Sequence, residues 1–139
     1  MNKDEFIKKW INTFASNLTF EQYEKYVDNA YIWHVFSFGL IDKNDYLEDD
    51  EARRAFDAAD KTDAMYFLLF EDEPCTKKLP EKFNTADKIE NSELTYVDCV
   101  CAGTPIYMEF YVVSKDFSWT YIVTHEDLCG PYFMNIKQI

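Results

Sequence analysis

The sequence predicts an α+β fold in which a mostly antiparallel sheet of about five strands has the N-terminal helices packed on one face. Three observations lead to this prediction. Apolar residues in much of the first sixty positions recur at helical spacing, the last third is rich in aromatic and β-branched runs, and short turns separate these runs. With 139 residues, of which 47% are hydrophobic, the chain is expected to form a single globular domain over residues 1–139.

Three helices are expected in the first half of the chain. The first should span residues 4–16, because apolar side chains recur there at spacings of 1, 3, 1 and 3 from Phe6 to Phe14. Thr19 and Gln22 have the spacing of a capping box, which predicts a second helix over about residues 20–30 that packs on the first. Residues 47–60 should form the third helix, since two aspartates are each followed by an arginine four positions later.

The strands are predicted from aromatic and β-branched runs that end at glycine, proline or acidic residues. In chain order the expected strands are residues 31–38, 64–70, 94–102, 106–113 and 118–125, with a final edge strand over 132–136. Residues 114–117 fit the loop of a hairpin, and the strands from 94 to 125 should form an antiparallel meander. Residues 74–92 contain two prolines and should be mostly loop, with a short helix capped by Asn84.

The charge of the chain is strongly negative and unevenly distributed. Twenty-six acidic and fourteen basic residues give a net charge of -12, which argues against nucleic acid as a partner because its phosphates would be repelled. Residues 42–73 hold twelve of the acids and four of the bases, so most of the excess lies there. Such a segment is either a solvated face or a surface for a basic protein partner. The candidate interaction patch is Asp42, Asp45, Asp49, Asp50, Glu71, Asp72 and Glu73.

Several classes of protein are not favoured by the sequence. No apolar run approaches the roughly 20 residues of a membrane helix, and the N-terminal residues lack the apolar segment of a secretory signal, so we expect a cytoplasmic protein without a membrane partner. Cys75, Cys99, Cys101 and Cys129 should then be thiols, and their spacing does not match a zinc signature. With three glycines and no phosphate-binding or nucleophile-elbow motif, no catalytic residue, cofactor or metal ligand is assigned, and a non-enzymatic role is favoured.

The two histidines allow two interpretations. His34 and His125 each lie in an aromatic run and would share strand faces with apolar neighbours. Each is then a partly buried ring that makes a local hydrogen bond, or the two form a pair that binds a metal or moves a proton with the help of an acid. The candidate ligand cleft for the second interpretation consists of Trp33, His34, Trp119, His125 and Glu126.

Three strings carry a resemblance to a known family. They are WHVFSFGL at 33–40, EARRAFDAA at 51–59 and DFSWTYIVTHEDLCGPYF at 116–133. Their most specific part is a W-T-Y-x-x-T-H-E block followed by G-P-Y-F. On these strings the sequence resembles a bacterial family of uncharacterised proteins, domain of unknown function 4275. The resemblance implies a bacterial cytoplasmic origin and brings no activity, cofactor or established site.

Two functional hypotheses follow from these observations. The first is a small non-enzymatic interaction module whose acidic surface binds a basic protein partner, since small acidic α+β proteins are similar in type to antitoxins and immunity proteins. The alternative is a metal- or small-ligand-binding protein, with an enzyme as one form of it, that uses His34 and His125. The sequence does not indicate an oligomeric state.

Overall fold

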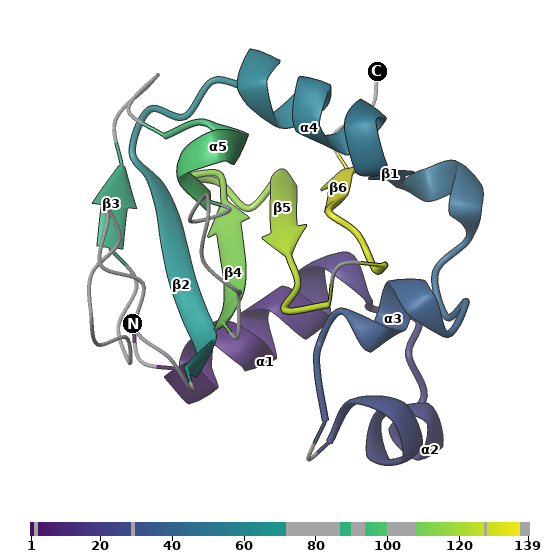
Figure 1. Cartoon of the computed structure of the whole chain (residues 1–139). Coiled ribbons are helices and arrows are strands. Elements are labelled where there is room, and N and C mark those ends of the chain that lie inside the picture. The colour runs from purple at the N-terminus through teal and green to yellow at the C-terminus, as the bar shows by residue number, and fades with distance from the viewer. Residues whose placement is uncertain are drawn as a thin grey trace.

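A six-stranded sheet runs through the molecule in the order β1-β6-β5-β4-β2-β3, and all neighbouring strands are antiparallel (Figure 1). The structure is a computed structural model that describes residues 1, 3–28, 30–71, 87–89, 94–99, 108–126 and 128–136. The strands are β1 (Leu47–Glu48), β2 (Ala64–Glu71), β3 (Asp87–Ile89), β4 (Met108–Val113), β5 (Trp119–Val123) and β6 (Tyr132–Asn135). The α+β class and the antiparallel sheet are as the sequence predicted.

The helical segments occupy mainly the first half of the chain. They are α1 (Lys3–Phe14), α2 (Phe20–Gln22), a π-helical turn η1 (Tyr23–Val27), α3 (His34–Ser37), a 3-10 turn η2 (Lys43–Asp45), α4 (Asp49–Ala58) and α5 (Tyr96–Cys99). Helices α1 and α4 confirm two of the three expected helices, and the one expected over about residues 20–30 is present as α2 followed directly by η1, which ends at Val27. The capping box is also confirmed, because the Thr19 side chain accepts from the Gln22 N–H at 3.1 Å and the Gln22 side chain accepts from the Thr19 N–H at 3.0 Å. None of the helices within the described residues is long and apolar enough to cross a membrane.

Helix α1 covers one face of the sheet. Its apolar stripe of Phe6, Trp10 and Phe14 is buried in one cluster with the side chains that β4, β5 and β6 direct to this face. The indole N–H of Trp10 donates to Thr120 Oγ1 at 2.9 Å, and that hydroxyl donates to the Val112 carbonyl oxygen at 2.9 Å. This buried chain of hydrogen bonds fixes α1 to two strands of the sheet.

Helix α4 covers the opposite face, so the sheet lies between two helical layers (Figure 1). Ala52 and Phe56 are fully buried, and the Phe56 ring stacks on Tyr121 with ring centroids 4.1 Å apart. The N-terminal helix packs on one face as expected, and the second layer is an addition to the prediction. Both faces being covered explains why every residue of β5 is buried.

The prediction of a strand over residues 31–38 is wrong, because residues 34–37 form helix α3. The helix ends in a Schellman motif, in which Gly39 N–H donates to the Phe36 carbonyl and Leu40 N–H to the Val35 carbonyl. Gly39 has φ +70°, the left-handed conformation that this motif requires. An aromatic run indicates that its side chains are buried, not that its backbone is extended. Here Val35 and Phe36 of the helix are buried in the cluster under α1.

The strand expected over residues 94–102 is also wrong where the structure describes it, since residues 96–99 form helix α5. The Tyr96 N–H donates to the Asp57 carboxylate of α4 at 3.2 Å. A side chain distant in the sequence therefore satisfies a backbone donor of the first turn of this helix, which no local pattern reveals. Residues 100–102 lie outside the described residues.

Two further expectations concern the edges of the sheet. Residues 132–136 contain strand β6 as expected, yet β6 is not an edge strand because β1 pairs with it. In the region 74–92, residues 87–89 form β3 and pair with β2. The rest of that region, including Asn84 and the proposed short helix, lies outside the described residues.

Candidate functional site

The residues of the predicted acidic patch do not all lie together. Asp42, Asp45, Asp49 and Asp50 are exposed and follow one another along η2, β1 and the first turn of α4. Glu71 ends β2, and three strands separate β2 from β1 in the sheet. Asp72 and Glu73 lie outside the described residues. The structure therefore brings four of the seven candidates to one edge of the sheet and places Glu71 away from them.

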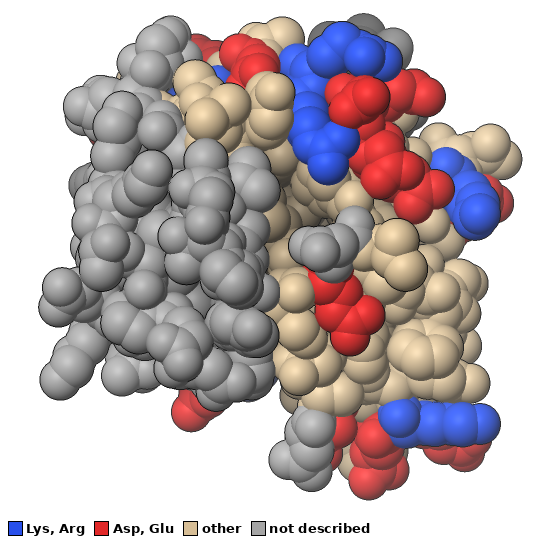
Figure 2. Space-filling view, viewed as in Figure 1, with Lys and Arg blue, Asp and Glu red and all other residues tan. Residues whose placement is uncertain are grey.

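We call the exposed carboxylates of residues 42–51 the acidic edge, because they flank the edge strand β1. Its members are Asp42, Asp45, Glu48, Asp49, Asp50 and Glu51, and Lys43 is the single base of this stretch. In Figure 2 acidic residues (red) gather over the start of α4, and basic residues (blue) lie beside them. Arg53 of α4 is one base close to this edge, because its Nη1 lies 2.6 Å from the Asp50 carboxylate.

Capping of helical turns and the helix dipole account for some of these carboxylates. The Asp42 side chain accepts from the Asn44 N–H at 2.8 Å and so caps η2. Asp49, Asp50 and Glu51 stand in the first turn of α4, where the helix dipole favours negative side chains. Asp45 has no cationic partner among the described residues, and no cap hydrogen bond of its side chain is seen there. Glu48, which precedes α4, likewise makes no cap hydrogen bond, so these local effects do not account for Asp45 or Glu48.

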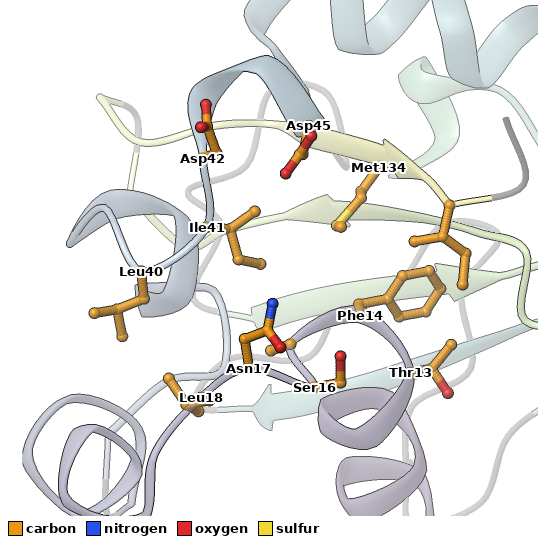
Figure 3. Close-up of a pocket in the computed structure, with 12 residues that line it drawn as sticks. Thr13, Phe14, Ser16, Asn17, Leu18, Leu40, Ile41, Asp42, Asp45 and Met134 are labelled. Carbon is orange, nitrogen blue, oxygen red and sulfur yellow. The ribbon is translucent and has the colours of Figure 1, made fainter.

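A pocket of about 400 Å³ opens next to the acidic edge (Figure 3). It lies between the C-terminal end of α1, the segment that joins α3 to η2, and strand β6. The lining residues are Thr13, Phe14, Ala15, Ser16, Asn17, Leu18, Leu40, Ile41, Asp42, Asp45, Met134 and Ile136. Figure 3 shows the Asp45 side chain directed towards Ile41 and Met134, whereas the Asp42 carboxylate points away from them. Sequence reasoning missed this pocket, although it had selected both aspartates.

The two histidines meet in one aromatic cluster even though 90 residues separate them in the chain. The Tyr31 ring lies 5.3 Å from His34 and 4.6 Å from His125, and the Trp33 ring lies 4.6 Å from His34 and 6.0 Å from His125, all between ring centroids. Tyr31 and Trp33 also stack on each other at 5.7 Å. The structure therefore brings His34, His125 and Trp33 of the candidate cleft together and adds Tyr31.

The His34 ring has a defined hydrogen-bond partner. Its Nδ1 lies 2.8 Å from the carbonyl oxygen of Tyr26, in the turn η1. Because a carbonyl oxygen can only accept, Nδ1 carries the proton and donates. In the neutral ring, Nε2 is then the nitrogen that can accept a proton or bind a ligand.

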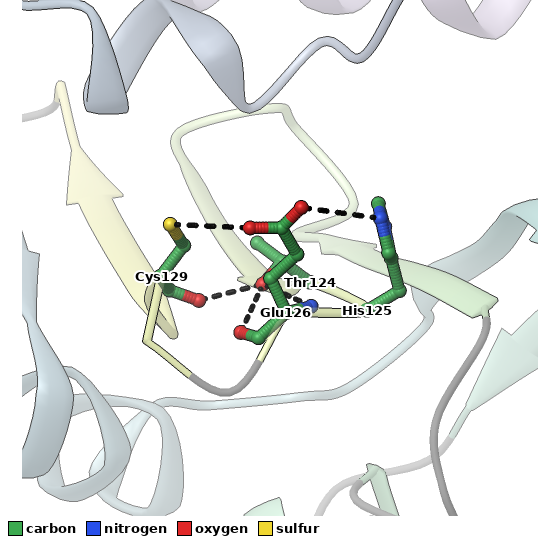
Figure 4. A network of polar contacts seen from close by, with 4 residues as sticks. All are labelled: Thr124, His125, Glu126 and Cys129. Atoms are coloured by element: carbon green, nitrogen blue, oxygen red, sulfur yellow. Dashed lines mark hydrogen bonds and ion pairs between the residues drawn. The ribbon is translucent and has the colours of Figure 1, made fainter.

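The turn after β5 holds a polar network around Glu126 (Figure 4). Thr124 Oγ1 lies 2.9 Å from the Glu126 carbonyl oxygen and 2.6 Å from that of Cys129, which ties the turn together. The Glu126 carboxylate lies 3.7 Å from His125 Nε2 and 3.9 Å from Cys129 Sγ. Burial first, and then the Glu126 carboxylate, raise the pKa of the Cys129 thiol. The thiol is therefore protonated at neutral pH and does not have the character of an activated nucleophile.

A family model described as Domain of unknown function (DUF4275) matches residues 3–133. The chain belongs to the DUF4275 family. This membership confirms the resemblance, and the matched range contains the acidic edge, the aromatic cluster and most of the pocket lining. No curated protein and no solved structure matched the chain.

In this DUF4275 protein, Trp119 is not part of the cleft that the sequence suggested. Its ring packs against Phe56 at 6.0 Å and against Phe133 at 5.5 Å, in the cluster under α4. Trp33 instead belongs to the cluster under α1, and the His125 ring contacts Trp33. Among the described residues, no three histidine, cysteine, aspartate or glutamate side chains are grouped so that they could hold a metal ion.

Lys61 is a buried charged residue of this DUF4275 protein that the sequence did not single out. Its Nζ lies 3.4 Å from the Asp57 carbonyl oxygen and 3.3 Å from that of Ala59, at the C-terminal end of α4. Desolvation lowers the pKa of this amine, and neighbouring Asp57 opposes the shift. A cation at the C-terminal end of a helix is a stabilising arrangement, so Lys61 has a structural role as a cap.

Proposed function

We propose that this DUF4275 protein is a non-enzymatic interaction module of the cytoplasm that binds a basic protein partner through the acidic edge, as an antitoxin or immunity protein does. One observation carries the proposal: six exposed carboxylates and a single lysine occupy residues 42–51 beside a short edge strand. Concentrated charge of one sign accelerates association with a partner of the opposite sign, and this attraction weakens as salt is added. The same charge disfavours nucleic acid and anionic lipid as partners.

The test is affinity capture from a lysate of the source organism with three baits. The first bait is the unchanged chain. The edge variant carries Asp45→Asn, Asp49→Asn and Asp50→Asn. The control variant carries Asp4→Asn, Glu21→Gln and Glu24→Gln, three exposed acids outside the edge, so both variants lose the same charge.

The proposal expects one basic protein to bind the unchanged chain and the control variant at low salt, and to be lost from the edge variant. Raising the ionic strength to about 0.5 M should release it, because exposed charges are screened within a few ångströms at that concentration. If the basic protein is lost equally from the edge variant and the control variant, net charge alone retains it. That result, or the absence of any basic protein, would refute the role of the acidic edge.

A second candidate function is favoured by the contacts of the two histidines with Tyr31 and Trp33. It is the binding of a metal or small ligand by His34 and His125, and an enzyme would be one form of it. Elemental analysis of the purified chain, together with melting temperatures in Zn²⁺ and Ni²⁺, tests this candidate against a His125→Ala variant. Bound metal, or a melting temperature that rises with an ion only when His125 is present, would favour it over an interaction module. No bound metal and no ion-dependent change would remove the metal-binding form of this candidate.

A further inference from the structure

We infer that the pocket beside the acidic edge receives an arginine side chain of the basic partner. The inference rests on the proposed function and specifies which chemical group of the partner is recognised. Two features of the pocket support it independently of the charge on the rest of the edge. One is the electrostatic character of the lining, and the other is the division of the lining into an apolar part and hydrogen-bond acceptors.

The lining of the pocket favours a cation. Its twelve residues include Asp42 and Asp45 and contain no lysine, arginine or histidine. Residues 13–18 of the lining come from the C-terminal end of α1 and the turn that follows it. The C-terminal end of a helix carries partial negative charge, and the last turn of α1 has no basic residue to offset it. The Asp45 carboxylate and a helix terminus of the same sign therefore act on one cavity, and Asp42, whose carboxylate points away, adds negative charge at its rim.

The rest of the lining favours an aliphatic chain behind the cation. Phe14, Leu18, Leu40, Ile41 and Met134 supply apolar surface around the cavity (Figure 3). A volume of about 400 Å³ lies at the lower end of the range for ligand sites, which suits one long side chain. Arginine buries its methylene groups along apolar surface while its head group stays with polar atoms, so its two parts match the two parts of the lining.

The acceptors favour a guanidinium group over an ammonium group. The Asp45 carboxylate lies on one side of the pocket, and Thr13, Ser16 and Asn17 add polar oxygens on the α1 side, as Figure 3 shows. A guanidinium group carries five N–H donors in one plane, so it can bind a carboxylate with two donors and still reach acceptors on the opposite side. An ammonium group is a compact point charge and cannot span both sides in this way.

A titration with small probes tests the pocket without the partner. The full chain is labelled at its methyl groups, and the signals of Leu18, Leu40, Ile41 and Met134 are followed by NMR. The probes are N-acetyl-arginine amide, the lysine analogue, and the citrulline analogue, which has nearly the shape of arginine and no charge. We expect saturable shifts with the arginine probe, weaker binding of the lysine probe by a factor of about three or more, and no saturation with the citrulline probe.

Two variants and one matched control locate the binding. Asp45→Asn should lower the affinity for the arginine probe about tenfold, as expected for loss of a charge-assisted hydrogen bond. Asn17→Lys, at an exposed position of the rim, should weaken it similarly because it adds a cation from the chain itself. Glu51→Gln removes the same charge outside the pocket and should change the affinity less than about twofold.

Three results would overturn the inference: no saturable shift at these methyl groups, equal binding of the arginine and citrulline probes, or equal effects of Asp45→Asn and Glu51→Gln. Unchanged methyl spectra of the unliganded variants show that they are folded. If affinity capture identifies a basic partner while the arginine probe does not bind, the proposed function stands and only the pocket inference fails. If the probe binds while no partner is captured, the pocket recognises a guanidinium group, but the proposed function fails and with it the assignment of that group to a partner.

Discussion

Replacing Thr120 by valine should loosen the attachment of α1 to the sheet, and with it the wall of the pocket. The Thr120 hydroxyl accepts from the buried indole N–H of Trp10 and donates to the Val112 carbonyl oxygen, each at 2.9 Å. Valine has nearly the same shape, so the change leaves no cavity but leaves the indole N–H without its partner. A buried donor left unpaired costs about 1–3 kcal/mol, and we expect a loss of about 2 kcal/mol in the free energy of unfolding.

Urea unfolding of the unchanged chain, Thr120→Val, Trp10→Phe and the double variant measures this contribution as a double-mutant cycle. In a chain of 139 residues, 2 kcal/mol corresponds to a fall in melting temperature of roughly 6–8 °C. Once Trp10→Phe has removed the donor, Thr120→Val should cost at least about 1 kcal/mol less than it does in the unchanged chain. Thr120→Ser keeps the hydroxyl and should show the coupling to Trp10. An equal cost of Thr120→Val in both backgrounds would refute the reasoning.

Three further expectations concern the capping box, the second helical layer and high pH. Thr19→Ala should lower the unfolding free energy by about 1 kcal/mol, and a urea midpoint that does not move would contradict the capping box seen at α2. Phe56→Ala should cost about 3–5 kcal/mol because Phe56 is fully buried against Tyr121, and a loss under about 1 kcal/mol would contradict the packing of α4. Burial raises the pKa of Tyr121 and of Tyr132 above the ordinary 10.0, so the unfolded state loses these protons first and stability should fall as the pH rises above that value. The lowered pKa of Lys61 makes stability rise with pH, but only up to the ordinary lysine pKa of 10.5. Above that pH only the tyrosine effect remains, so a urea midpoint that stays constant there would contradict the burial of the two tyrosines.

Local sequence patterns were sufficient to predict those elements whose own geometry sets the spacing of residues. The apolar stripe from Phe6 to Phe14 predicted α1, and Thr19 with Gln22 predicted the start of α2. The hairpin of β4 and β5 followed from two β-rich runs and a short loop between them. In each case the repeat or spacing is set by the geometry of the element itself, so no knowledge of distant contacts was required.

Local patterns failed where distant residues decide the conformation. The aromatic run around His34 is buried but helical, and Gly39 at its end was a signal of a helix C-terminus that we interpreted as the end of a strand. Helix α5 begins where Asp57, 39 positions away, accepts from the Tyr96 N–H. The nearly uninterrupted apolar run of residues 119–123 could have predicted that β5 is covered on both faces, because a strand exposed on one face would alternate apolar and polar residues.

The candidate site was predictable in its chemistry and not in its geometry. Charge counting selected Asp42 and Asp45, but the pocket beside them is assembled from three segments of the chain that have no common signature. The two histidines were chosen as a pair, yet their meeting point is Tyr31, which neither spacing nor composition indicates. Trp119 was grouped with His125 because alternation along an expected strand places both side chains on one face, and the α4 layer that covers Trp119 was not predicted.

The proposed function depends on a negative potential that is concentrated at residues 42–51 rather than spread over the surface. Paramagnetic relaxation of amide protons by a cationic and an anionic nitroxide of similar size measures the local potential along the chain without any partner. We expect the most negative values at η2, β1 and the first turn of α4, clearly below those at α2, where Glu21 is also exposed. Values at the acidic edge equal to those at α2 would contradict this expectation.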